Sequence, residues 1–415
     1  MSATPHRPGS HGHAHSPARE PGQAWRFAAA GLCASLVGLG LARFAYTPLI
    51  PALIAAQWFS PSDVIYLGAA NLAGYLAGAL AARPLAARTG AVRALRGTMV
   101  LATLSCLACA MPITFAWFFA WRFLAGLSGG VIMVLAASAI LPHTAPGKRG
   151  LVGGVIFAGV GLGIAASGTL VPLLLQQGLR ESWLGLAALS GVLTLVAWPN
   201  WPKGDPAAAS HSGAVAARPR LSAAVPALTL QYGLNAVALV PHMVFVVDFI
   251  ARGLGQGIAA GSQYWVLYGL GAVVGPLLTG HLADRAGFRP ALRAAFLIQA
   301  VAAVIPAITT APAALIVSCV VIGGFTPGIV PLVLGRIHEL IPHGAEAQRA
   351  AWGRATTMFA LFQAGAAYGL AALFDRTGGD YHILFVVGSA AAALALAIDF
   401  VLALTVRARP SGASS

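Results

Sequence analysis

Long apolar stretches recur along the whole chain and are separated by short polar breaks. Most are close to the roughly 20 residues that an α-helix needs to cross the hydrocarbon core of a bilayer. The pattern predicts twelve membrane-spanning helices, at about 25–55, 64–82, 95–111, 114–141, 151–174, 182–200, 222–250, 260–282, 291–311, 313–335, 352–374 and 381–406. The division of 95–141 into two helices depends on Pro112 and on the total length of that stretch.

The composition supports the same fold class. Of the 415 residues, 58% are apolar and 9% are charged, whereas a soluble domain carries about 25% charged residues. We therefore predict an all-α integral membrane protein in contact with the lipid bilayer. No catalytic triad, metal-ligand spacing or nucleotide-binding loop fits between these spans, so we expect no enzyme activity, no cofactor and no metal site.

The Lys and Arg residues are distributed unevenly between the two sides of the predicted bundle. Of the 25, 20 fall in the N-terminal segment and in alternate breaks, three fall in the opposite breaks, and two lie inside spans. The positive-inside rule then places both termini in the cytoplasm. The net charge of +14 follows from this topology, and nucleic acid is not expected as a partner.

The longest polar break divides the spans into two sets of six. We predict a disordered tail at 1–24, a six-helix bundle at 25–200, a linker at 201–221, a second bundle at 222–407 and a short tail at 408–415. The loop GHLADRAGFRPALR at 280–293 repeats RPLAARTGAVRALR at 83–96 with an offset of 197 residues. A parallel repeat of this size is typical of transporters with two pseudo-symmetric six-helix bundles.

The second copy of this loop carries a family resemblance. Its pattern G-x-L-A-D-R-x-G-x-R, with Gly280, Asp284, Arg285, Gly287 and Arg289, resembles the signature loop of the major facilitator superfamily, and WRFLAGLSGG at 121–130 resembles that superfamily's fourth-helix motif. The stretches at 41–51, 71–78 and 351–369 resemble the YbfB/YjiJ group of bacterial transporters.

The resemblance implies a monomeric transporter of the bacterial inner membrane that moves a small solute by alternating access, with a proton as the coupling ion. Two departures from the family's sequence pattern weaken the interpretation of the chain as a drug-efflux transporter. The first copy of the loop has Ala87 where the family usually has aspartate, and the fifth span lacks the Gly-Pro pair of drug antiporters.

In the 280–293 loop, Gly287 is expected to supply the backbone freedom of a tight turn between two helices. The resemblance implies that Asp284 faces the start of the fifth span, where a carboxylate meets the positive end of a helix dipole. We expect Asp284 and Arg285 to latch this side in the outward-facing state. The alternative is a solvated turn with topology-setting arginines.

Two arginines lie inside predicted spans, where a charge costs at least about 2.5–3.5 kcal/mol. Arg43 lies about 24 Å along the first helix and Arg122 about 12 Å along the oppositely directed fourth helix, so both sit at similar depth. No carboxylate lies in the first six spans, and an anionic substrate would supply the missing charge. Alternatively, both bond main-chain carbonyls, including those that Pro48 and Pro51 leave free.

Other polar residues in the spans are candidates for substrate contact or gating. They are Tyr46, Asn71, Gln231, Tyr232, Asn235, His242, Thr326 and Gln363, each of which could instead hydrogen-bond a neighbouring helix. His242 or Asp248 is the candidate carrier of a coupling proton, although an aspartate near the outer end of a helix could also simply face water.

Glycines four residues apart predict close helix packing. The pairs are Gly74 with Gly78, Gly126 with Gly130, Gly159 with Gly163, Gly271 with Gly275, and Gly365 with Gly369.

The sequence thus predicts a secondary transporter for a small organic solute, preferably an anion. Proton-driven drug efflux is the main alternative, and a membrane receptor without flux is a third.

Overall fold

The computed structural model describes residues 21–145, 148–202, 223–342 and 345–407. These residues form helices and no strand, and twelve of the helices are long and apolar enough to cross a membrane. The predicted fold class and number of spans are confirmed. Of the expected tails and linker, only 21–24 and 201–202 fall within the described residues.

The first half contains six spans. They are α1 (Pro21–Ser35) with η1 (Leu36–Phe44) and α2 (Tyr46–Ala55), α3 (Pro61–Thr89), α4 (Ala91–Cys109), α5 (Phe115–Ile140) with η2 (Leu141–His143), α6 (Arg149–Leu175), and α7 (Leu179–Ala197) with η4 (Trp198–Asn200). The expected break near Pro112 is present, and Thr114 caps α5 by accepting a hydrogen bond from the amide of Trp117 at 3.1 Å.

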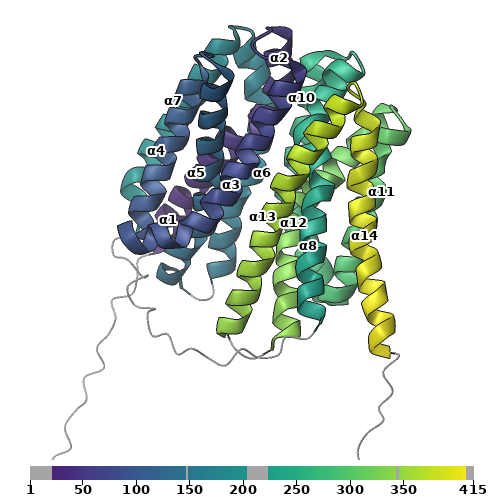
Figure 1. Cartoon of the computed structure of the whole chain (residues 1–415). Coiled ribbons are helices and arrows are strands. Elements are labelled where there is room, and N and C mark those ends of the chain that lie inside the picture. The colour runs from purple at the N-terminus through teal and green to yellow at the C-terminus, as the bar shows by residue number, and fades with distance from the viewer. Residues whose placement is uncertain (1–20, 146–147, 203–222, 343–344, 408–415) are drawn as a thin grey trace, which may run out of the picture.

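The second half repeats this order. Its spans are α8 (Ala224–Val240) with η6 (Pro241–Phe245), α9 (Val246–Asp248) and η7 (Phe249–Gly253), then α10 (Gly257–Ala286), α11 (Phe288–Ile308), α12 (Pro312–Leu340), α13 (Ala345–Arg376) and α14 (Tyr381–Arg407). Figure 1 shows the two halves as adjacent bundles of long, nearly parallel helices.

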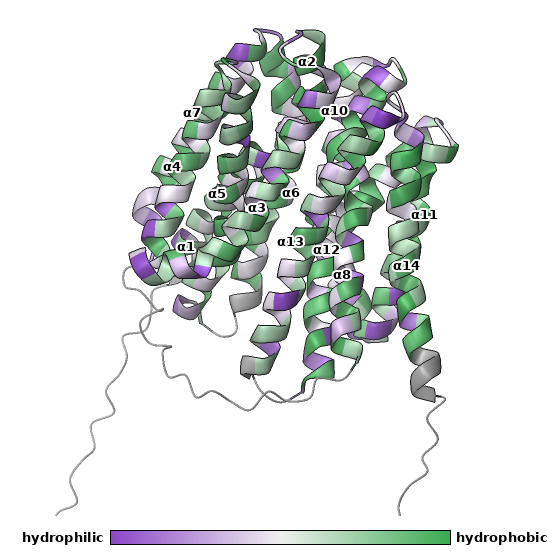
Figure 2. Cartoon of the chain, in the orientation of Figure 1, coloured by the Kyte–Doolittle hydropathy of each residue, from purple (hydrophilic) through white to green (hydrophobic). Residues whose placement is uncertain are grey.

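The two ends of the molecule are distinguished by the chain ends. α1 begins and α14 ends on the same side, which we call the terminal side (Figure 1). The opposite side, called the distal side, carries the turns at 56–60, 110–114, 176–178, 254–256, 309–311 and 377–380. Hydrophobic residues cover most of both bundles, and hydrophilic residues gather mainly at their ends (Figure 2).

The first and seventh spans are interrupted by π-helical segments. In the first span, η1 ends where the amide of Ala45 bonds the carbonyl of Gly40 at 2.9 Å, and α2 restarts at Tyr46. This restart puts Pro48 in the first turn of α2, where amide groups lack helical partners in any case. The seventh span has π-helical turns at η6 and η7. π-helical turns change the direction of the side chains that follow and are frequent at functional sites.

Glycines allow main chains to touch within each half. A Cβ added to Gly126 of α5 would lie 1.9 Å from the carbonyl oxygen of Asn71 in α3, and one added to Gly271 of α10 would lie 2.1 Å from that of Val320 in α12. Similar close approaches occur at the other members of the first four predicted glycine pairs, Gly74, Gly78, Gly130, Gly159, Gly163 and Gly275. Close packing is therefore confirmed for those four pairs.

The fifth predicted pair is wrong. A Cβ added to Gly365 or Gly369 would meet no atom within 4 Å, and both residues are exposed. They share a helix face with Leu361, which is 51% exposed, so no helix among the described residues packs against this face of α13. Glycine spacing permits a close approach but does not create a partner for it.

Candidate functional site

The two halves pack against each other on the distal side. In α2, every residue from Tyr46 to Leu53 is buried, and in the seventh span every residue from Pro241 to Ala251 is buried. The hydroxyl of Thr47 donates a 2.7 Å hydrogen bond to the main-chain oxygen of Met243, which joins the two segments directly.

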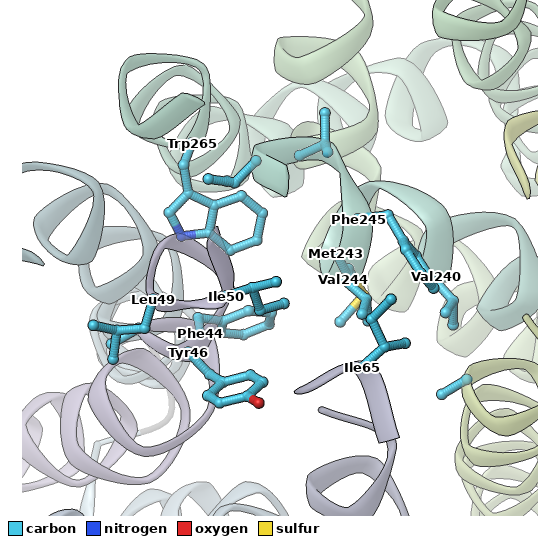
Figure 3. Packing of buried hydrophobic residues seen from close by; sticks show 14 of the residues in the cluster. Phe44, Tyr46, Leu49, Ile50, Ile65, Val240, Met243, Val244, Phe245 and Trp265 are labelled. Atoms are coloured by element: carbon cyan, nitrogen blue, oxygen red, sulfur yellow. The ribbon is translucent and has the colours of Figure 1, made fainter. Parts of the chain in front are cut away.

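Apolar side chains fill the space between these segments. Ile50 and Ile65 of the first half lie in one buried cluster with Met243 and Val244 of the second (Figure 3). Trp265 of α10 covers the same region, and its indole nitrogen donates to the hydroxyl of Ser167 in α6 at 3.1 Å. The distal side is therefore closed by packed side chains from both halves.

A small cavity lies beside this closure. It is lined by Arg43, Phe44, Tyr46, Thr47, Ile50, Gly68, Asn71, Leu72, Arg122, Met243 and Val244. Its volume of about 20 Å³ is enough for about one water molecule. The structure thus brings the two intramembrane arginines to one cavity, together with two of the other predicted candidates, Tyr46 and Asn71.

Arg122 is held by the main chain of the first span. It is 2% exposed, and its Nη1 donates to the carbonyl oxygen of Ala42 at 2.8 Å. Its guanidinium carbon lies 4.0 Å from the ring centroid of Tyr46, whose hydroxyl donates to Val64. Arg122 therefore bonds a main-chain carbonyl, as the alternative interpretation proposed. The acceptor, Ala42, is not one of the carbonyls that Pro48 and Pro51 leave free.

Arg43 has a different partner. Its Nη2 donates a 2.8 Å hydrogen bond to the side-chain oxygen of Gln363, which comes from α13 in the opposite half. Its guanidinium carbon lies 4.7 Å from the ring centroid of Tyr75 and 5.0 Å from that of Phe44. Within the described residues, no hydrogen bond joins the guanidinium of Arg43 to a main-chain carbonyl, and its buried Nε has no partner.

No carboxylate of the described residues forms an ion pair with either arginine. The ion pairs among the described residues are Arg252 with Asp248, Arg289 and Arg293 with Asp399, and Arg336 with Glu339. Two buried guanidinium groups thus share one cavity, and none of its lining residues is acidic. Ring contacts recover about 0.5–2 kcal/mol, less than the several kcal/mol that desolvating an ion costs. The arrangement favours a ligand with negative charge.

Asn71 supports this wall. Its side-chain nitrogen donates to the carbonyl oxygen of Arg122 at 3.1 Å and to that of Ala42 at 3.5 Å. It thereby ties α3 to the first and fourth spans where they carry the arginines. Its own side-chain oxygen has no partner within the described residues.

Three candidates of the seventh span point away from the cavity. Gln231 donates to the carbonyl oxygen of Ala395 at 2.8 Å, and Asn235 donates to the side chain of Gln299 at 2.5 Å. The ring of His242 lies 2.8 Å from the hydroxyl of Ser318. All of these partners belong to α11, α12 or α14, so the three side chains lie inside the second half.

Asp248 does not face water. It is fully buried, and its carboxylate accepts hydrogen bonds from Arg252 at 2.5 and 2.7 Å and from the hydroxyl of Tyr381 at 2.6 Å. The alternative that this aspartate simply faces water is therefore wrong. Through Tyr381, this ion pair anchors the distal end of the seventh span to the start of α14.

The loop between α10 and α11 lies on the terminal side. Gly287 has a φ of +84° and links the two helices, as the motif predicted, and Gly90 has a φ of +86° at the equivalent position of the first half. Asp284 and Arg285 are exposed and make no ion pair among the described residues, whereas Arg289 pairs with Asp399 in α14. The latch expected from the sequence therefore has no ion pair within the described residues.

Sequence reasoning missed the rings that surround Arg43 and the partners of Asp248. Tyr75 follows Asn71 by four residues and so shares its helix face, and Arg252 follows Asp248 by four. The four-residue spacing in each pair is thus a sequence signal for these contacts.

A family profile matches most of the chain. The family profile described as "Uncharacterised MFS-type transporter YbfB" matches residues 35–400. No curated protein matches the chain. A bacterial homologue of the human lysosomal transporter Spinster, solved in an inward-facing and unoccupied conformation, is 16% identical, with a TM-score of 0.67 over 95% of this chain and 100% of its own. A D-xylose-proton symporter is 13% identical, with a TM-score of 0.69 over 90% of this chain and 96% of its own. At these identities the similarity concerns the fold.

Proposed function

Because the chain belongs to the family of YbfB-like transporters of the major facilitator superfamily, we propose that it carries a small organic anion across the bacterial inner membrane by alternating access. The two six-helix halves rock about a central site, and the chain works as a monomer without a cofactor. The unequal distribution of Lys and Arg places the terminal side in the cytoplasm. The closed distal side then corresponds to an inward-facing conformation, as in the Spinster homologue with the same fold.

The observation that carries this proposal is the pair of buried arginines in one cavity without a carboxylate. A guanidinium group binds a carboxylate through two parallel hydrogen bonds, and this supplies both the missing charge and the missing acceptors. Arg43 and Arg122 therefore bind the substrate's negative group, and Tyr46 and Asn71 hold Arg122 in place.

Proton coupling completes the proposal. Asp248 and His242 are the candidate carriers, and neither contacts an arginine of the cavity. Since both lie on the seventh span, a change in their protonation acts on the substrate site through the movement of that span.

The test measures ligand binding and transport together. Purified protein is screened by thermal shift against carboxylates, phosphates and lipophilic cations, because a ligand that binds only the folded state raises its stability. We expect carboxylates to stabilise the wild type, and Arg43→Ala and Arg122→Ala to weaken their binding about 30-fold or more, as truncation of one partner of a buried charged pair costs about 2–5 kcal/mol.

Arg96→Ala is the matched control. Arg96 also donates to a carbonyl oxygen, that of Trp198 at 2.6 Å, and stacks on the Trp198 ring, but it lies on the terminal side in another part of the first half. We expect this variant to alter stability and leave carboxylate binding unchanged. Stabilisation by lipophilic cations with no effect of the cavity arginines would instead favour drug efflux, and binding without flux in proteoliposomes would favour a receptor.

A further inference from the structure

Gln363 occupies an unusual position at the boundary between the halves. It is 2% exposed and reaches from α13 to the guanidinium of Arg43, 320 residues earlier in the chain. Because a guanidinium only donates hydrogen bonds, the atom of the amide that faces it must be the oxygen.

The other end of this amide is weakly held. The nitrogen of Gln363 donates to the thioether sulfur of Met243 at 3.6 Å, and sulfur is a poor acceptor. Gln363 is therefore fixed mainly by its charge-assisted bond to Arg43.

Only one of the two parallel N–H groups of the Arg43 guanidinium has a hydrogen-bond partner among the described residues. Nη2 is bonded to Gln363, while Nε is buried and has no partner among the described residues. Nε and one Nη of an arginine present two parallel N–H groups, which match the two oxygens of a carboxylate. A single amide oxygen fills one of these two positions and brings no net charge.

We propose that Gln363 is an internal surrogate for the carboxylate of the substrate, and that an entering carboxylate displaces it from Arg43. The inference rests on the proposed function and adds a specificity-determining residue to it. In the empty protein the amide oxygen lowers the cost of the buried guanidinium. A bound carboxylate takes both Nε and Nη2 and releases the amide.

The exchange has a conformational consequence. The bond between Arg43 and Gln363 joins the two halves in the conformation whose distal side is closed. A ligand that displaces Gln363 from Arg43 breaks this bond, and the conformation with the closed distal side loses a contact between the halves. Binding therefore shifts the equilibrium away from the closed distal side, as alternating access requires, in proportion to the contacts it replaces.

The experiment compares three variants of the full-length protein in detergent, with sodium benzoate, sodium lactate and disodium succinate as separate probes. Gln363→Ala removes the competitor, so we expect the best wild-type probe to bind roughly tenfold more tightly. Gln363→Glu places a carboxylate in the fork, so we expect a higher melting temperature without probe and no further rise with it.

Gln299→Ala is the matched control. Gln299 is a fully buried glutamine whose partner, Asn235, lies in the same half. We expect this variant to melt at a lower temperature and to bind the probes with unchanged affinity.

Unchanged or weaker probe binding by Gln363→Ala, with binding that still requires Arg43, overturns the surrogate role and leaves the anion transporter intact. If Gln363→Glu does not fold, Gln363→Ala alone decides. If no probe stabilises the wild type or Gln363→Ala, the anion site itself fails and this inference falls with it.

Discussion

The hydroxyl of Thr47 and the main-chain oxygen of Met243 form a 2.7 Å hydrogen bond across the two halves of the molecule, 196 residues apart in the chain. Both residues are buried in the distal closure and both line the arginine cavity. The closure and the candidate substrate site are thus built from the same two segments, so a change in one must alter the other.

Thr47→Val should open the distal side more often. The variant keeps the shape of the side chain but leaves the oxygen of Met243 without this donor, at a cost of about 1–3 kcal/mol in the closed conformation. This corresponds to a shift of roughly five- to 150-fold in the conformational equilibrium. The measurement is the labelling rate of Ile50→Cys by a membrane-impermeant maleimide added from the distal side.

Thr279→Val is the control for that prediction. Thr279 donates to the carbonyl oxygen of Gly328 at 2.8 Å within the second half. It should lower the melting temperature without faster labelling at residue 50. Equal labelling in both variants would show that the bond of Thr47 does not bias the closure.

Asp248 and Arg252 should show unequal effects on stability. Arg252→Ala leaves a buried carboxylate with Tyr381 as its one remaining partner among the described residues, which we expect to cost about 3–5 kcal/mol. Asp248→Asn should cost less, about 1–3 kcal/mol, because the side chain of Arg252 is 30% exposed and can reach water. Melting temperatures should therefore fall in the order wild type, Asp248→Asn, Arg252→Ala, with the double variant above Arg252→Ala.

The variant Asp248→Asn also tests proton coupling. If Asp248 carries the coupling proton, Asp248→Asn abolishes the response of transport to a pH gradient while substrate exchange continues. Transport by this variant that still follows the pH gradient would exclude Asp248 and leave His242 as the carrier.

Asp284→Asn should change transport but not the stability of this conformation. Asp284 is exposed and unpaired within the described residues, and surface substitutions of that kind usually stay within about 0.5 kcal/mol. In the outward-facing state the lost carboxylate weakens the latch, so we expect slower transport and a larger inward-facing fraction. Wild-type rates and populations in this variant would contradict the latch.

Gly126→Ala and Gly365→Ala should have opposite effects. A Cβ at residue 126 would lie 1.9 Å from the carbonyl oxygen of Asn71 and would force α3 and α5 apart, so we expect loss of several kcal/mol or no folded protein. A Cβ at residue 365 meets open space in a helix, where alanine is favoured over glycine by about 0.5–1 kcal/mol. Melting temperatures of the purified variants check both, and a destabilised Gly365→Ala would reveal a partner for this face.

Several features of the site could be predicted from residue types and spacing. Arg43 and Arg122 stood out because charge in a membrane span is costly and needs an explanation. Gly287 was predictable because a turn between two helices requires backbone freedom. The glycine pairs of α3, α5, α6 and α10 were also correctly assigned to close packing, whereas the equally spaced Gly365 and Gly369 were not.

What the sequence determined by itself was the order of the spans, their division into two repeats and the presence of unpaired charge inside them. Lipid imposes these features locally, since every span must be long, apolar and internally hydrogen-bonded. The tertiary structure alone decided which partner each polar side chain meets. Arg43 meets Gln363 from the other half, and His242 turns into the second half, because helix rotation and packing between distant spans set these contacts.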